Sequence, residues 1–172
     1  MLRYAVADFL CVLMAALALN PAPAAAAEKL DSDRINATDP NLKAFFGHGG
    51  RLLHYHGWAD QQIAPANSVN YYNSVLDMDT LGGSAKVRDS YRLFMVPGMG
   101  HCRGGDGTDK FDMVSALEQW VEKGRAPEQI VASRVRDGKV DCTRPLCPYP
   151  QVATYKGTGS TDDAANFVCK AP

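Results

Sequence analysis

Residues 91–102, which read YRLFMVPGMGHC, decide the fold of this chain. The apolar run 91–96 predicts a buried strand, and Pro97 with the glycines that follow ends the strand and releases the backbone into a loop. His101 lies in that loop. Open α/β sheets place their functional side chains on loops at the carboxyl ends of strands, so His101 is a candidate general base. The alternative is a turn histidine held by backbone hydrogen bonds.

Upstream, residues 51–60 repeat this arrangement with the sequence RLLHYHGWAD. They predict a strand over 51–55 and a turn over 56–60, followed by a helix over about 66–78. The turn ends on Asp60, a carboxylate of the kind that orients a catalytic imidazole. The alternative for this residue is a turn aspartate that caps the following helix.

A second predicted helix follows the His101 loop, with Asp109 as its N-cap and Gly124 as its C-terminal stop. Two successive strand–helix units predict the α/β class, with a parallel sheet covered on both faces. Residues 130–135 predict a further short strand, and residues 142–169 are expected to be irregular. On the helix predicted between Asp109 and Gly124, apolar residues recur on one face at Phe111, Val114, Leu117, Trp120 and Val121.

The predicted acid and base, Asp60 and His101, have no recognisable nucleophile. The chain order serine, acid, histidine requires a G-x-S-x-G elbow before Asp60, and none is present. Trp58 is expected either to shield an Asp–His hydrogen bond from water or to fill the core. Four serines are poor substitutes for the nucleophile because none lies in such an elbow: Ser68, Ser84, Ser90 and Ser115.

A metal site is a weaker interpretation of the same region. His54 and His56 are two residues apart on a predicted strand and therefore point to the same face, as a pair of metal ligands would. No third ligand stands at a recognisable spacing. The acidic residues Asp106, Asp109 and Asp112 do not fit the calcium-loop template. We therefore expect no cofactor from the sequence itself.

The composition is that of a soluble globular chain: 172 residues, 46% hydrophobic and 22% charged, with a formal charge of -1. Such a charge gives no reason to expect nucleic acid or an anionic membrane as a partner.

Residues 1–27 have the three-part pattern of a signal peptide, and 28–40 predict a flexible linker. We expect a secreted or periplasmic protein with no membrane association after cleavage. The alternative, a membrane anchor, has too short an apolar run.

Four cysteines remain after the predicted cleavage, an even number in an oxidising compartment, and they favour disulfides. Four cysteines allow three pairings, and the residues themselves leave all three open. Cys147 and Cys169 flank a Pro- and Gly-rich segment that a disulfide would stabilise by about 3 kcal/mol. The other two are Cys102 and Cys142.

Three motifs together, HGWAD at 56–60, GMGHC at 98–102 and RPLCPYPQVA at 144–153, resemble the tannase and feruloyl esterase family. The resemblance extends from about residue 39 to 169. It implies an α/β-hydrolase fold and a Ser-Asp-His serine esterase that acts on aromatic carboxylic esters. In that family Asp60 matches the acid and His101 the base.

The resemblance also assigns the cysteines. Cys102 matches a cysteine that bridges to a partner beside the nucleophilic serine, and Cys147 and Cys169 match a C-terminal disulfide. Without its family partner, Cys102 is expected to be free, paired with Cys142 or bridged to another chain.

The stretch that carries the serine, the oxyanion hole and the lid, which often binds calcium, has no counterpart in this chain. We therefore expect residues 41–172 to form the C-terminal βαβα portion of a hydrolase, with an irregular, disulfide-stapled C-terminus. The chain is expected to be inactive alone, and to be either the product of an internal deletion or one half of a split enzyme with a complementing N-terminal half. The alternative is a noncatalytic exported binding or interaction module derived from that fold.

Overall fold

The computed structural model of the chain describes three ranges, residues 25–27, 29–30 and 37–172. The chain divides into two compact units, Met1–Asp39 and Pro40–Pro172. Most of the predicted signal peptide, 1–27, and half of the predicted linker, 28–40, lie outside the described residues, so both stay predictions. No helix within the described ranges is long and apolar enough to cross a membrane.

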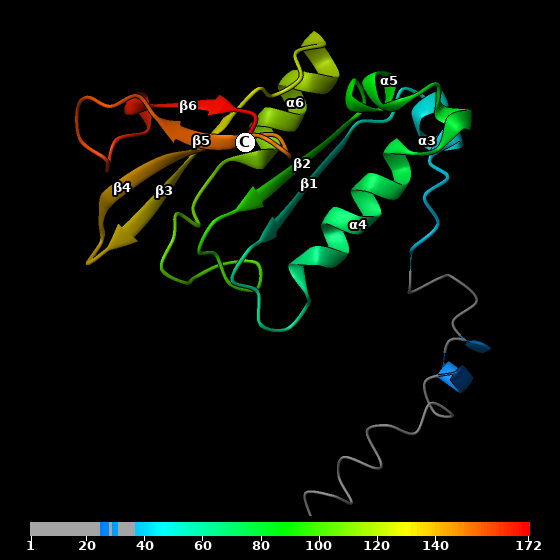
Figure 1. The fold of residues 1–172 in the computed structure, drawn as a ribbon, viewed down its shortest axis with the longest axis horizontal. Coiled ribbons are helices and arrows are strands. Elements are labelled where there is room, and N and C mark those ends of the chain that lie inside the picture. Colours follow the sequence, from blue (N-terminus) through cyan, green and yellow to red (C-terminus); the bar gives the residue numbers. More distant parts are fainter. Residues whose placement is uncertain (1–24, 28, 31–36) are drawn as a thin grey trace, which may run out of the picture. The chain divides into compact units, whose positions relative to one another are not determined.

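A parallel pair of strands forms the centre of the second unit (Figure 1). β1, Leu52–Gly57, pairs along its whole length with β2, Tyr91–Val96. β2 lies where the sequence predicts it, whereas β1 extends past the expected end at residue 55. His56 and Gly57 belong to the strand and not to the turn, because β2 continues through Val96 and offers both residues a paired backbone.

Both faces of the parallel pair are covered, as predicted. The odd-numbered residues of β2 pack in one core cluster with Tyr72 and Val75 of α4, Pro65–Leu76. The even-numbered apolar residues of β2 pack in a second cluster with Ala116 of α6, Met113–Lys123. Alternation along the strand sends neighbouring side chains to opposite faces, which explains the two clusters. Three short helical elements complete this part: α3, Lys43–Gly47, η1, Asp79–Leu81, and α5, Ser84–Arg88.

The N-cap of α6 is Asp112, whose side chain accepts a hydrogen bond from the Ser115 amide at 3.0 Å. The prediction of Asp109 was wrong, because its carboxylate accepts from the Gly104 amide at 2.7 Å and contacts Lys110 instead. Gly124 ends the helix in the left-handed region, as predicted.

The predicted apolar face of α6 was also partly wrong. Trp120 is buried, but Val114 and Val121 are exposed. Since the helix begins at Met113, the side that meets the core includes Ala116 and Trp120, and the two valines lie off that side.

The strand predicted over residues 130–135 is confirmed, but residues 142–169 are not irregular, and that prediction is corrected: the C-terminal part forms two antiparallel pairs. The first pair is a hairpin closed at Asp137 and Gly138, a local turn signal that the sequence analysis did not use. The second pair joins two short strands across residues 156–166. The cluster with Phe94 includes Ile130 and Leu146 from the first pair. The first pair consists of β3, Ile130–Arg136, and β4, Lys139–Leu146. The second pair consists of β5, Val152–Tyr155, and β6, Phe167–Lys170. A short helix, η2, Ala164–Asn166, precedes β6.

A disulfide joins Cys147, directly after β4, to Cys169 in β6, which confirms the predicted C-terminal pairing. The chain then runs beside β2, because the Tyr149 amide donates to the Leu93 carbonyl at 2.7 Å. The disulfide therefore anchors the C-terminal strands to a segment that is itself hydrogen-bonded to the central strand.

Candidate active site

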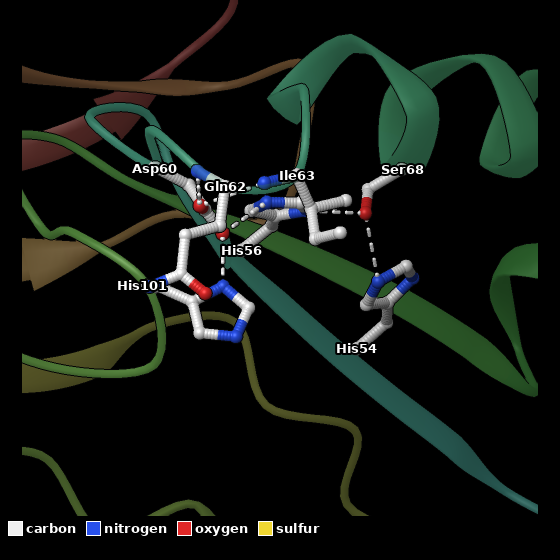
Figure 2. Close-up of polar contacts among 7 residues, drawn as sticks. All are labelled: His54, His56, Asp60, Gln62, Ile63, Ser68 and His101. Carbon is white, nitrogen blue, oxygen red and sulfur yellow. Dashed lines mark hydrogen bonds and ion pairs between the residues drawn. The ribbon is translucent and has the colours of Figure 1, made fainter.

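Asp60 and His101 meet at the carboxyl end of the parallel pair. Nδ1 of His101 lies 2.8 Å from Oδ2 of Asp60, although the residues are 41 positions apart (Figure 2). Asp60 follows β1 and His101 follows β2, and parallel strands that pair in register end at the same edge. The structure therefore brings together the two residues that the sequence singled out.

The two loops touch through their backbones. The Ala59 amide, in the Asp60 turn, donates to the Met99 carbonyl, in the His101 loop, at 3.0 Å. A Cβ added to Gly57 would lie 2.2 Å from the same Met99 oxygen. The glycine at the end of β1 thus allows the His101 loop to approach the Asp60 turn closely.

Asp60 uses both carboxylate oxygens. Oδ1 accepts from the amides of Gln62 and Ile63 at 2.8 and 3.0 Å, and Oδ2 accepts from His101 and from Nε2 of His56, the latter at 3.0 Å. Burial alone would raise the pKa of Asp60, but the hydrogen bonds from Ile63, Gln62 and His101 outweigh it and hold the pKa below its usual range. The carboxylate is therefore ionised at neutral pH.

Asp60 does not cap α4, so that alternative is wrong. The N-cap of α4 is Ala64, which makes no side-chain capping bond. Asp60 instead binds amides two and three residues ahead and so closes its own turn. This turn holds the carboxylate in place with only 3% of its side chain exposed.

His101 presents one free edge of its ring. Because the ionised carboxylate only accepts, Nδ1 of His101 carries the proton in this contact, which leaves Nε2 as the unprotonated nitrogen of the neutral ring. The side chain is 39% exposed. This is the orientation in which an imidazole takes a proton from a nucleophile at Nε2.

A cavity of about 230 Å³ opens beside His101. Apolar groups supply part of its wall, and Asp60 and His101 supply the polar part. Trp58 is half exposed and lines a different cavity, of about 110 Å³, so the expectation that it covers the Asp–His pair finds no support. The cavity beside His101 is lined by Tyr55, His56, Gly57, Asp60, Ile63, Met99, His101 and Cys102.

A hydrogen-bonded chain of side chains extends from Asp60 into the core (Figure 2). Nδ1 of His56 lies 2.6 Å from Oγ of Ser68, and this oxygen lies 3.1 Å from Nε2 of His54. Nδ1 of His54 lies 2.8 Å from the hydroxyl of Tyr91. Sequence reasoning missed the connection to Ser68, although the two-residue spacing of the histidines already placed them on one face.

The metal interpretation of His54 and His56 does not hold. All four ring nitrogens contact a hydroxyl or carboxylate of the protein, so neither ring offers a nitrogen to a metal. Burial, with the nearby His56, lowers the pKa of His54. No group of three or more potential metal ligands occurs among the residues that the structure describes.

Ser68 is not positioned as a nucleophile despite its contact with a histidine. The residue is 8% exposed, its hydroxyl lies between two imidazoles, and it does not line the cavity beside His101. The other three serines also lie outside that cavity: Ser84 begins α5, Ser90 accepts from Arg51, and Ser115 binds the α6 N-cap.

Within residues 37–172, the two cysteines outside the disulfide are free thiols. Cys102, next to His101, is exposed, and Cys142 is buried. Of the states expected for Cys102, the disulfide with Cys142 is therefore not formed.

The parallel pair with an acid and a histidine at its carboxyl edge defines part of an α/β-hydrolase fold. The chain superimposes on an esterase from Aspergillus oryzae with a TM-score of 0.76 and 34% identity, over 86% of this chain and 32% of that one. Feruloyl esterase B from the same organism gives a TM-score of 0.74 and 33% identity, over 86% of this chain and 32% of that one.

The family model described as tannase and feruloyl esterase matches residues 19–170, and the chain belongs to this family. It is 45% identical over 144 residues to mono(2-hydroxyethyl) terephthalate hydrolase from Piscinibacter sakaiensis, which covers 81% of this chain and 23% of that protein. A probable feruloyl esterase B-1 from Aspergillus fumigatus is 38% identical over 164 residues, 86% of this chain and 31% of that protein. The chain thus spans about a quarter to a third of these relatives.

Proposed function

We propose that this chain supplies the acid and the base of a serine carboxylic-ester hydrolase. The observation that carries the proposal is the 2.8 Å contact between His101 Nδ1 and Asp60 Oδ2 at the carboxyl edge of the parallel strands. The contact leaves Nε2 of His101 facing outward beside the cavity. A base held in one orientation by a carboxylate is what acyl transfer to a serine requires.

In the proposed reaction, Nε2 of His101 takes the proton of a serine hydroxyl as its oxygen attacks the ester carbonyl. Asp60 accepts the Nδ1 proton and stabilises the imidazolium that forms. The imidazolium then returns the proton to the departing alcohol, which leaves an acyl-enzyme. A water molecule, deprotonated by the same Nε2 atom, hydrolyses the acyl-enzyme and regenerates the serine.

We infer that the substrate is an aromatic carboxylic ester. Two of the relatives are named mono(2-hydroxyethyl) terephthalate hydrolase and probable feruloyl esterase B-1, which supports the inference. The cavity beside His101 has Tyr55, Ile63 and Met99 in its wall, and such apolar groups suit an aromatic ring.

We further propose that the chain acts as a fragment and needs a complementing part that carries the serine and the oxyanion-hole donors. The chain spans only about a quarter to a third of its relatives' length, which supports this proposal. The unpaired edge of β1 supports it as well. In the described residues the parallel sheet has only two strands, and β1 has β2 as its single neighbour. An unpaired strand edge is a site where further strands add.

Export to the periplasm or the medium is part of the proposal. The Cys147–Cys169 disulfide supports it, since such bonds persist in oxidising compartments. The pattern of residues 1–27 points in the same direction.

A noncatalytic exported module is the second candidate, because none of the serines considered above lines the cavity beside His101. One measurement, an assay of ester hydrolysis, distinguishes the esterase from the noncatalytic module. Hydrolysis of methyl gallate and methyl ferulate is followed with the chain alone, and then after addition of a serine-bearing N-terminal half from a family relative. His101→Ala is the control in both arms.

We expect hydrolysis only after mixing, and its loss in His101→Ala. Hydrolysis by the chain alone that requires His101 would overturn the claim that the nucleophile is missing. No hydrolysis in either arm would overturn the esterase proposal for this chain and favour the binding module.

A further inference from the structure

We propose that His56 is a positioning residue that fixes the Asp60 carboxylate for His101, and that Ser68, His54 and Tyr91 set the tautomer in which His56 does so. The proposal rests on the roles given above to Asp60 and His101. It adds a second histidine to the site, one that acts through the acid and not by proton transfer to or from the reacting groups.

The geometry of Oδ2 of Asp60 is the first step. One carboxylate oxygen receives two imidazoles, His101 at 2.8 Å and His56 at 3.0 Å. The other oxygen is held by two backbone amides. The His56 contact therefore ties down the side of the carboxylate that faces His101, and without it only the more exposed His101 ring would hold that oxygen.

The direction of each hydrogen bond follows from the two ends of the chain of contacts. At one end Asp60 is ionised and can only accept, so Nε2 of His56 must donate. At the other end burial, reinforced by the neighbouring Tyr71 and Tyr72, raises the pKa of Tyr91. Its hydroxyl therefore keeps a proton that it can donate to Nδ1 of His54.

With Nε2 of His56 donating to Asp60 and both imidazoles neutral, the other three contacts have one arrangement in which each is a hydrogen bond. Nε2 of His54 donates to Oγ of Ser68, and the Ser68 hydroxyl donates to Nδ1 of His56. Both imidazoles are then neutral and protonated at Nε2. The reverse direction would require a second proton on His56, because its Nε2 must still donate to Asp60.

The elements that carry these groups explain why the arrangement is rigid. His54 and His56 lie on one face of β1, Ser68 lies on α4, which packs on that face, and Tyr91 begins β2. Figure 2 shows the Ser68 hydroxyl joined to both imidazoles, with the Asp60 turn on the far side of His56. The core of the domain thus dictates the tautomer of His56, and His56 in turn aims the carboxylate.

The test reads the imidazole nitrogens of the full chain by ¹⁵N NMR, which distinguishes the tautomers that coordinates do not show. In the wild-type chain above the titration range of the histidines, we expect His54 and His56 protonated at Nε2 and His101 protonated at Nδ1. A spectrum with His56 protonated at Nδ1, or with His101 protonated at Nε2, would overturn the proposal without any variant.

Variants then separate positioning from general packing. His56→Leu removes the donor to Asp60, whereas His56→Gln retains an N–H near the place of Nε2. Leu53→Ala is the matched control, since it removes a half-buried side chain from the opposite face of β1, where it packs in the second core cluster. We expect His101 to lose its single Nδ1–H tautomer in His56→Leu and to keep it in His56→Gln and Leu53→Ala.

An unchanged His101 spectrum in His56→Leu would contradict the proposal. If that variant does not fold, Ser68→Ala gives the answer, because removing the donor to Nδ1 should let His56 populate both tautomers. An unaltered His56 tautomer in Ser68→Ala would overturn the assigned direction of the chain.

These readouts require no catalysis. Failure of the hydrolysis assay with the expected tautomers in place would count against the esterase function alone. The opposite result, hydrolysis on mixing with the wrong tautomer at His56, would count against the positioning role alone.

Discussion

A Cβ on Gly57 would lie 2.2 Å from the carbonyl oxygen of Met99, a separation that real Cβ contacts do not reach. Gly57 is the last residue of β1, and Met99 belongs to the loop that carries His101. The acid-bearing and base-bearing segments therefore leave no room for a side chain at this contact.

Gly57→Ala should displace the loop at Met99 and Gly100, because its methyl group meets backbone atoms that cannot rotate away. We expect a loss of about 1–3 kcal/mol in the free energy of unfolding, as is typical for overpacked sites. Urea denaturation measures it. Gly47→Ala is the matched control, since a Cβ there meets nothing within 4 Å. Equal stability of the two variants would show that the loop yields without cost.

Asp60→Asn should remove part of the acid sensitivity of folding. The pKa of Asp60 is lower in the folded chain than the value of about 3.9 expected for the unfolded chain, so ionised Asp60 stabilises the fold above that pH. This stabilisation is lost as the pH falls through the folded-state pKa. The difference in unfolding free energy between wild type and Asp60→Asn should therefore be large at neutral pH and shrink towards low pH.

The control for that experiment is Asp137→Asn in the exposed turn between β3 and β4. Asp137 has a φ of 50°, which asparagine also adopts readily, so this change should leave the pH profile as it is in wild type. Parallel pH profiles for wild type and Asp60→Asn would contradict the linkage.

Replacing both Cys147 and Cys169 by alanine should lower stability by about 3 kcal/mol, the value that the chain-entropy model gives for a loop of this size. The two residues are 22 positions apart in sequence. Denaturation of the double variant and of the wild type, each with and without reductant, measures the loss. Reductant should destabilise the wild type only, and an insensitive wild type would show that the bond contributes little.

Asp112→Ala should cost about 1 kcal/mol of stability, because it removes the N-cap of α6. The side chain of Asp112 accepts from the Ser115 amide, which otherwise lacks a helical partner. Glu118→Ala, at an exposed position within the same helix, is the control and should have little effect. Similar losses in the two variants would argue that the helix does not depend on this cap.

Cys102 should react with iodoacetamide in the native chain, whereas Cys142 should react only after unfolding. The first thiol is exposed and the second is buried. Peptide mapping by mass spectrometry after short labelling identifies the modified residue. Rapid labelling of Cys142, or protection of Cys102, would contradict the described burial.

The strands β1 and β2 and the helix α4 could be predicted because each has a local signal. Residues 91–96 are nearly continuously apolar, and turn-forming residues follow both strands. The strands β5 and β6 had only a weak signal, since each is four residues long and the two pair across the connection formed by residues 156–166. The N-cap of α6 was misplaced by three residues, as both Asp109 and Asp112 are suitable and only the loop contacts distinguish them.

The sequence by itself determined that Asp60 and His101 would share an edge, because both follow strands of a parallel pair and parallel strands end together. It also determined that His54 and His56 would share a face, because side chains alternate along a strand. Only the tertiary structure decided which side chain connects His54 to His56. Ser68 reaches both histidines because α4 packs over β1, and this packing depends on contacts among residues far apart in the chain.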